Sequence, residues 1–173
     1  NQAEHFIPGV GSSAIMDYDG MANTYTLIGE DKTTYVFDGT TLLLQSRSWP
    51  SNESWTYEYY ESGDGSDLEG KLKQASDAYD RYLQFTYIRD TDPDEYKRQQ
   101  LWRVGDHTAD GLDGNSPTGR YIEFEYVPES EDGSPVTGRT PLALLFSVQD
   151  VRGNTWEYDY YGQASSETTP ALL

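Results

Sequence analysis

The sequence lacks cysteine and contains only two histidines, His5 and His107, among its 173 residues. Without cysteine the chain has no disulfides, no thiol nucleophile and no cysteine-ligated zinc site. A histidine-based triad needs a nucleophile and an orienting carboxylate around the ring. The adjacency of Asp106 and His107 does not supply that geometry. The thirty acidic residues single out no carboxylate pair, and no glycine-rich phosphate loop is present. We therefore predict a non-enzymatic protein without a cofactor.

Basic residues and long apolar runs are also scarce. Lys and Arg number 12 against 30 Asp and Glu, which gives a formal net charge of −18. Contact with nucleic acid or with an anionic membrane surface needs Lys and Arg, so we predict neither as a partner. The longest apolar run, residues 142–146, is far too short for a transmembrane helix. We interpret the acidic residues chiefly as a solvated surface.

Aromatic residues, by contrast, are abundant, with 15 Tyr, 4 Trp and 5 Phe. They recur with a period of two, which is typical of strands. For example, Trp156, Tyr158 and Tyr160 alternate with polar residues. Five segments carry this pattern, each ending in two aromatic residues two positions apart: 32–37, 53–59, 81–87, 120–126 and 154–160.

A second kind of strand precedes three of these segments and pairs a leucine with an aspartate five positions later. The pairs are Leu72 and Asp77, Leu101 and Asp106, and Leu145 and Asp150. The linkers after Asp77 and Asp150 are equal in length, which indicates a tight turn between antiparallel strands. Together the patterns predict an all-β fold of sequential antiparallel β-hairpins in a curved, twisted sheet. A blade-like or sandwich arrangement is the alternative.

The remaining segments set the expected organisation. We expect an irregular N-terminal lead-in over 1–24, a β domain over 25–163 and a flexible tail over 164–173. We expect the acid-rich segments 61–69, 89–98, 106–113 and 128–132 to be solvent loops along one sheet edge. The chain starts at Asn1, so we expect a processed product or a segment of a longer protein. The predicted core consists of the alternating apolar residues: Tyr35, Phe37, Leu42, Leu44, Trp55, Tyr57, Tyr59, Leu72, Leu83, Phe85, Tyr87, Trp102, Val104, Ile122, Phe124, Tyr126, Leu144, Phe146, Val148, Trp156, Tyr158 and Tyr160.

The alternating pattern resembles the YD repeat of the bacterial RHS family. The resemblance is carried by Gly153, Asn154, Trp156, Tyr158, Asp159, Tyr160 and Gly162, by residues 119–126, and by residues 70–77. It covers roughly residues 25–163. It implies hairpins that wind into a continuous sheet, which in large members closes into a shell around a toxin or other cargo. It also implies a secreted or cell-surface bacterial protein, whose partners are further repeats or the enclosed cargo.

The sequence departs from the RHS pattern in its longer loops and in having too few repeats to enclose a cargo alone. A site for self-cleavage is not expected, because the only Asp-Pro, Asp92-Pro93, lacks the glycine that follows it in such members. Our leading hypothesis is a structural segment of a larger RHS-like protein. The alternative is a stand-alone module that binds carbohydrate or protein through exposed aromatic residues.

Two sets of residues are weak candidates for binding. Asp90, Asp92 and Asp94 have the spacing of the first ligands of a calcium loop, but Glu95 replaces the glycine and Leu101 replaces the final glutamate of that motif. The candidate glycan contacts are aromatic residues outside the predicted core faces, since such rings can stack on sugars: Trp49, Tyr60, Tyr79, Tyr96 and Tyr161. Packing between strands is the simpler interpretation of these rings.

Overall fold

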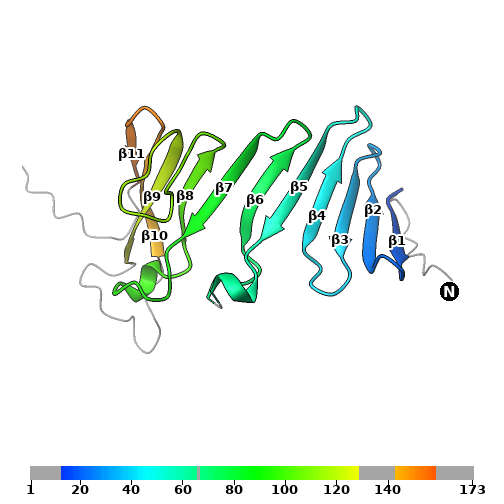
Figure 1. The fold of residues 1–173 in the computed structure, drawn as a ribbon, viewed down its shortest axis with the longest axis horizontal. Coiled ribbons are helices and arrows are strands. Elements are labelled where there is room, and N and C mark those ends of the chain that lie inside the picture. The colour runs from blue at the N-terminus through cyan, green and yellow to red at the C-terminus, as the bar shows by residue number, and fades with distance from the viewer. Residues whose placement is uncertain (1–12, 66, 129–142, 159–173) are drawn as a thin grey trace, which may run out of the picture. The chain divides into compact units, whose positions relative to one another are not determined.

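The computed structural model describes residues 13–65, 67–128 and 143–158. Its eleven described strands form one antiparallel sheet in which the strand order follows the chain order, so the predicted all-β fold of sequential hairpins is confirmed (Figure 1). Among the described residues, no helix has the length and apolar character needed to cross a membrane. The chain divides into two compact units, Asn1–Phe85 with Asp106–Thr108, and Thr86–Gly105 with Ala109–Leu173.

The first unit contains seven strands and one short 3₁₀ turn. These are β1 (Ile15–Asp19), β2 (Thr24–Ile28), β3 (Thr34–Asp38), β4 (Leu44–Ser48), β5 (Ser54–Tyr59), η1 (Ser62–Asp64), β6 (Leu72–Asp77) and β7 (Tyr82–Tyr87), whose last two residues belong to the second unit. The expected strands over 32–37, 53–59 and 81–87 therefore correspond to β3, β5 and β7. Strand β1 corrects the expectation that residues 1–24 are irregular, because Tyr18 pairs with Tyr25 across a turn.

The second unit contains four further strands and one 3₁₀ turn. These are η2 (Glu95–Lys97), β8 (Leu101–Asp106), β9 (Tyr121–Pro128), β10 (Ala143–Gln149) and β11 (Thr155–Glu157). Strand β8 matches the predicted leucine-to-aspartate segment, although its last residue is counted with the first unit. The row Phe124, Val148 and Trp156 crosses β9, β10 and β11 in register, as the alternation predicts. The predicted domain limits and tail reach into residues 159–173, outside the described residues, and stay predictions.

One five-residue turn recurs between strands. In each copy the first residue's N–H donates to the fifth residue's carbonyl at 2.8–2.9 Å, and the fourth residue has a left-handed backbone. The copies span 29–33, 49–53, 77–81 and 150–154, with φ of 64° at Lys32, 66° at Asn52, 59° at Asp80 and 80° at Gly153. A three-residue hairpin loop that ends in a left-handed residue is a common connection between antiparallel strands. The predicted equal turns after Asp77 and Asp150 are thus confirmed.

The strands of the first unit carry different chemistry on their two faces. One face has the register row Tyr35, Arg47 and Trp55, and its other rows include Tyr25, Phe37 and Tyr57. The row on the opposite face consists of small and mostly polar residues: Thr26, Val36, Ser46, Thr56 and Ser76. No residue of β1 to β5 is fully buried. This part of the sheet is therefore a single layer, stabilised by contacts between neighbouring side chains and by its ladders of hydrogen bonds.

The buried apolar positions differ from the predicted core. Leu68, Ala75 and Leu112 are 1%, 4% and 2% exposed, and two of them belong to loops. Leu42, predicted to be in the core, is 64% exposed and has a left-handed backbone in the β3–β4 turn. The predicted core residues Leu83, Trp156 and Tyr158 are also exposed. A single sheet layer leaves alternating side chains half-covered, and complete burial occurs where a loop folds against the sheet.

The acid-rich loops are correspondingly more structured than predicted. Leu68 anchors the loop between β5 and β6, and Leu112 anchors the loop between β8 and β9. Successive connections of an antiparallel sheet alternate between the ends of its strands. The loops over 89–98 and 106–113 therefore lie at opposite ends of β8 rather than along one edge, which corrects the prediction. Residues 129–132 of the fourth loop lie outside the described residues.

Candidate functional site

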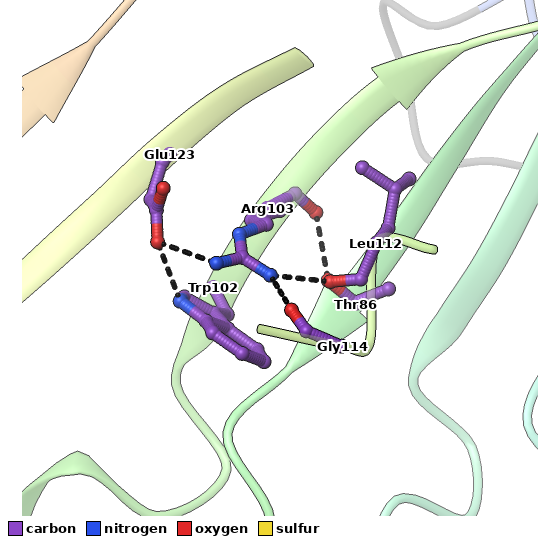
Figure 2. A network of polar contacts seen from close by, with 6 residues as sticks. All are labelled: Thr86, Trp102, Arg103, Leu112, Gly114 and Glu123. Atoms are coloured by element: carbon purple, nitrogen blue, oxygen red, sulfur yellow. Dashed lines mark hydrogen bonds and ion pairs between the residues drawn. The ribbon is translucent and has the colours of Figure 1, made fainter. Parts of the chain in front are cut away.

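The most enclosed polar cluster of the second unit is built around Arg103, in the middle of β8 (Figure 2). Arg103 is only 5% exposed. Its Nη1 donates to the carbonyl oxygens of Leu112 at 2.9 Å and Gly114 at 2.6 Å, and its Nη2 pairs with Glu123 Oε1 at 2.9 Å. The loop after β8 therefore folds back, and its carbonyl groups accept hydrogen bonds from a side chain of β8. Buried carbonyls and a buried cation satisfy one another here.

Further contacts fix the position of this cluster. The Trp102 indole N–H donates to the same Glu123 oxygen at 3.0 Å, and the indole ring lies 3.7 Å from the Arg103 guanidinium carbon. Gly105 admits the loop: a Cβ there would lie 2.5 Å from the Ala109 Cβ and 2.7 Å from a Leu112 methyl carbon. Every Arg103 nitrogen except Nε has a protein partner. We interpret the cluster as a clamp that holds the loop, since its donors are already used within the protein.

A second arginine, Arg47 in the first unit, lies among aromatic rings. Its guanidinium carbon is 4.2 Å from the centre of the Trp49 ring and 5.3 Å from that of Tyr35. Trp55 is its register partner on β5. Its Nε is buried without a hydrogen-bond partner. This arrangement places a cation on the aromatic face of the sheet.

Each of the four described candidate glycan contacts lies beside a basic residue. Trp49 contacts Arg47, Tyr60 lies 5.5 Å from Lys73 Nζ, and Tyr96 lies 5.4 Å from Lys97 Nζ. These three rings are only half-exposed, whereas Tyr79, at the β6–β7 turn, is 76% exposed and faces Arg81 at 5.5 Å. Tyr161 lies outside the described residues. The candidates come from both units, and the glycan role of each stays a prediction.

The aspartates of the candidate calcium loop are engaged locally. Asp90 accepts from the Gln99 amide at 3.2 Å, Asp92 accepts from the backbone N–H of Asp94 at 2.8 Å, and Asp94 pairs with Lys97 at 2.7 Å. In the described part of the chain no group of three or more His, Cys, Asp or Glu side chains is placed to hold a metal ion. Calcium binding at these residues stays an untested hypothesis.

Aspartates at the strand ends close several of the turns. The Asp38 carboxylate accepts from the backbone N–H groups of Thr41 at 2.7 Å and Thr40 at 2.9 Å, and these bonds hold its pKa below the ordinary value. The side chain of Asn154 and two backbone N–H groups likewise lower the pKa of Asp150. These carboxylates act as turn caps.

Asp77 caps the β6–β7 turn in the same way but is more enclosed, with a side chain only 9% exposed. Burial by itself raises the pKa of this carboxyl group. Hydrogen bonds from the Arg81 side chain and from the backbone N–H groups of Tyr79 and Arg81 outweigh burial, so the net shift of the pKa is downward. The leucine-to-aspartate motif of the sequence therefore encodes a strand with its turn cap.

Sequence reasoning missed both arginine clusters. The available signal was an arginine inside a strand, Arg47 in β4 and Arg103 in β8. Alternation places each of them on one defined face of the sheet, together with the side chains two positions away. The signal for the clamp was a lone leucine, Leu112, in an otherwise polar loop. Compared with known proteins, the chain matches no family model and no curated protein.

Proposed function

We propose that the protein is a non-enzymatic scaffold segment of a larger secreted or surface RHS-like protein. The observation that carries this proposal is the order of the sheet: eleven described strands follow one another in chain order, with the same five-residue turn used four times. Each strand therefore pairs only with its neighbours in sequence. Architectures of this kind grow by addition of repeats, and each added repeat buries the side of the one before it.

The ends of the described sheet support the same proposal. Strands β1 and β11 stand at the two ends of the strand order, and the three residues of β11 are all exposed. An edge strand offers N–H and C=O groups to another strand. Further repeats of the parent protein would pair there, and a cargo would face the sheet that they complete. The net charge of −18 disfavours nucleic acid as that cargo.

Light scattering combined with small-angle X-ray scattering tests the scaffold proposal. We expect the isolated chain to associate end to end as its concentration rises, because the edge strand of a second copy can take the place of a neighbouring repeat. A lysine on an edge strand disfavours such pairing. Thr155→Lys on β11 should therefore reduce association at that end. Val151→Lys, at an exposed position in the preceding turn, adds the same charge off the edge and should associate as the unchanged chain does.

A compact monomer at every concentration would contradict the scaffold proposal. That result would favour the alternative, a stand-alone module for carbohydrate or protein. The observation favouring the alternative is the exposure of Tyr79, whose ring is 76% accessible beside Arg81 at a hairpin turn. A glycan array probed with the folded chain, and with Tyr79→Ser as its control, would identify binding at this turn.

A further inference from the structure

The aromatic face of the first unit holds Arg47, whose charge has no acceptor among the described residues. Arg47 lies mid-strand in β4, between Tyr35 of β3 and Trp55 of β5 in register, and its guanidinium also contacts Trp49. The nearby rings limit the conformations of this long side chain. The guanidinium is therefore held in place before any ligand arrives, which lowers the entropic cost of binding.

In the described part of the chain, the donors of Arg47 have no acceptor. Nε is buried without a partner, and the guanidinium forms no hydrogen bond or ion pair with any described residue. The Asp31 carboxylate forms its hydrogen bonds with Thr33, and these bonds are the main reason that its pKa is lowered. The charge of Arg47 lowers that pKa to a smaller extent. The carboxylate accepts from the Thr33 backbone N–H at 3.0 Å and from the hydroxyl at 2.8 Å.

Other arginines of the chain make the contrast clear. Arg81 pairs with Asp77, Arg98 with Glu95, and Arg103 with Glu123. The stacked guanidinium of Arg47 pairs with no carboxylate of the described residues, although the chain carries 30 acidic residues. Because Nε is buried, the donors left for a ligand are the two terminal nitrogens, Nη1 and Nη2. Together they match a carboxylate, which accepts two parallel hydrogen bonds.

The overall charge restricts what can bring that carboxylate. A polyanion would place several charges beside a protein of net charge −18. A single carboxylate meets mainly Arg47, because screening confines charge interactions to about 8 Å at physiological ionic strength. The rings of Trp49 and Tyr35 lie against the cation, and Trp55 is its register partner. Such rings suit the apolar C–H face of a sugar ring better than an extended acidic peptide. We propose that Arg47, Tyr35, Trp49 and Trp55 form a binding site for a glycan that presents an isolated carboxylate-bearing sugar.

Titration with monosaccharides tests this site on the full chain. The probes are N-acetylneuraminic acid and glucuronic acid, followed by NMR through the Trp49 indole N–H and the Arg47 Nε–H signals. One bidentate contact and ring stacking correspond to a Kd on the order of 1 mM. The methyl ester of each sugar keeps the ring and removes the charge. We expect the ester to bind about ten- to a hundredfold more weakly, the loss typical of a hydrogen bond to a charged group.

Protein variants give a second test of the same site. Arg47→Gln should reduce the affinity for the acidic sugars by a similar factor. Arg152→Gln removes the same charge from a turn of the second unit and should leave the affinity unchanged. The ester comparison needs no variant, so it decides the question even where Arg47→Gln fails to fold.

Three results would overturn the proposal: no shift of these signals at several times the expected Kd, equal affinity for acid and ester, or equal affinity of Arg47→Gln and the unchanged chain. A short acidic peptide that binds Arg47 more tightly than either sugar would also overturn it and indicate a protein partner. The scattering experiment on the sheet edges is independent of these titrations, so the failure of one proposal is distinguishable from the failure of the other.

Discussion

The two compact units each place an arginine in mid-strand with a buried, unpartnered Nε, but they treat it differently. In the second unit the loop after β8 folds back and satisfies Arg103 with two carbonyls and Glu123. In the first unit Arg47 is packed between rings and has no described acceptor. The same residue type therefore holds a loop in one unit and has no acceptor among the described residues in the other. The difference between the two arginines is the loop after β8, which covers Arg103 and supplies its acceptors.

Stability is unevenly distributed within each unit. Strands β1 to β5 of the first unit contain no fully buried residue, so each contact there is partial and replaceable. Burial is concentrated at a few points: Leu68 and Ala75 in the first unit are 1% and 4% exposed, and Arg103 and Leu112 in the second are 5% and 2% exposed. Substitutions at such points should cost much more than substitutions at positions that remain half-exposed, since solvent compensates poorly for what is lost there.

The largest contrast should appear when the two arginines are replaced by methionine. Arg103→Met leaves Glu123 partly buried without its cation and removes the donor to two loop carbonyls. We expect a loss of about 3–5 kcal/mol in the free energy of unfolding, as for one broken half of a buried ion pair. Arg47→Met removes only stacking, with an expected loss of about 0.5–2 kcal/mol. Urea unfolding followed by circular dichroism measures both, and equal losses would refute the distinction between the two arginines.

Truncation of the leucine that seats the covering loop should have the next largest effect. Leu112→Ala empties a fully enclosed position and should cost about 2–3 kcal/mol of stability, within the range for buried leucines. Leu42→Ala, at a position 64% exposed in the first unit, should change stability by less than about 0.5 kcal/mol. Thermal melts of the two variants compare them directly. A minor effect at Leu112 would mean that the loop contributes little to the second unit.

Substitutions at left-handed turn positions should have a smaller effect on the free energy of unfolding, and its sign should differ between the two units. Leu42 has φ of 59° and Gly153 has φ of 80°, in the region that disfavours side chains. Leu42→Gly should stabilise the first unit by about 0.5–1 kcal/mol, and Gly153→Ala should destabilise the second by about the same amount. Differential scanning calorimetry gives both values. A destabilising Leu42→Gly would show that this exposed leucine packs against something in solution.

Acid should weaken the turns of the first unit more than those of the second. The pKa values of Asp31, Asp38 and Asp77 in the first unit, and of Asp150 in the second, are lowered by folding. A lowered pKa contributes stability that is present above the unfolded value, about 3.9, and is lost as the pH falls through the folded value. We therefore expect the melting temperature to decrease once the pH is lowered below about 4.

A pair of variants tests the origin of that acid sensitivity. Asp38→Asn should reduce the drop in melting temperature, because an amide does not titrate. Asp113→Asn, on an exposed side chain in the loop of the second unit, should leave the drop as it is. Backbone amide signals of Thr40 and Thr41 report on the Asp38 turn itself, and a pH-independent pattern there would rule out this cap as a contributor.

The regular parts of the fold were predictable because their signals are local. Alternation from Trp55 to Tyr59 defines a strand face within one segment, and the equal linkers after Asp77 and Asp150 define the turns. The predicted core failed at Leu42, where the turn needed a left-handed residue and the side chain points away from any cover. Alternation identifies a face of a strand, but it does not say whether anything covers that face.

The candidate sites were less predictable than the strands for the same reason. The exposure of Tyr79 follows from its place in a turn, which the sequence indicates. The setting of Arg47 depends on Tyr35, which comes from a different strand. The loop residue Leu112 was assigned to solvent because its neighbours are polar, yet it is among the most buried residues described. The burial of such residues depends on how a whole segment packs against the sheet.

The sequence by itself determined the all-β class, most strand positions and the turns that join them, because side-chain period and turn chemistry act over a few residues. The tertiary structure alone decided that Arg103 is bonded to a covering loop and that Arg47 has no acceptor among the described residues. That outcome depends on cross-strand register and on a loop that folds back onto β8. Both are set by packing between segments, which no local pattern encodes.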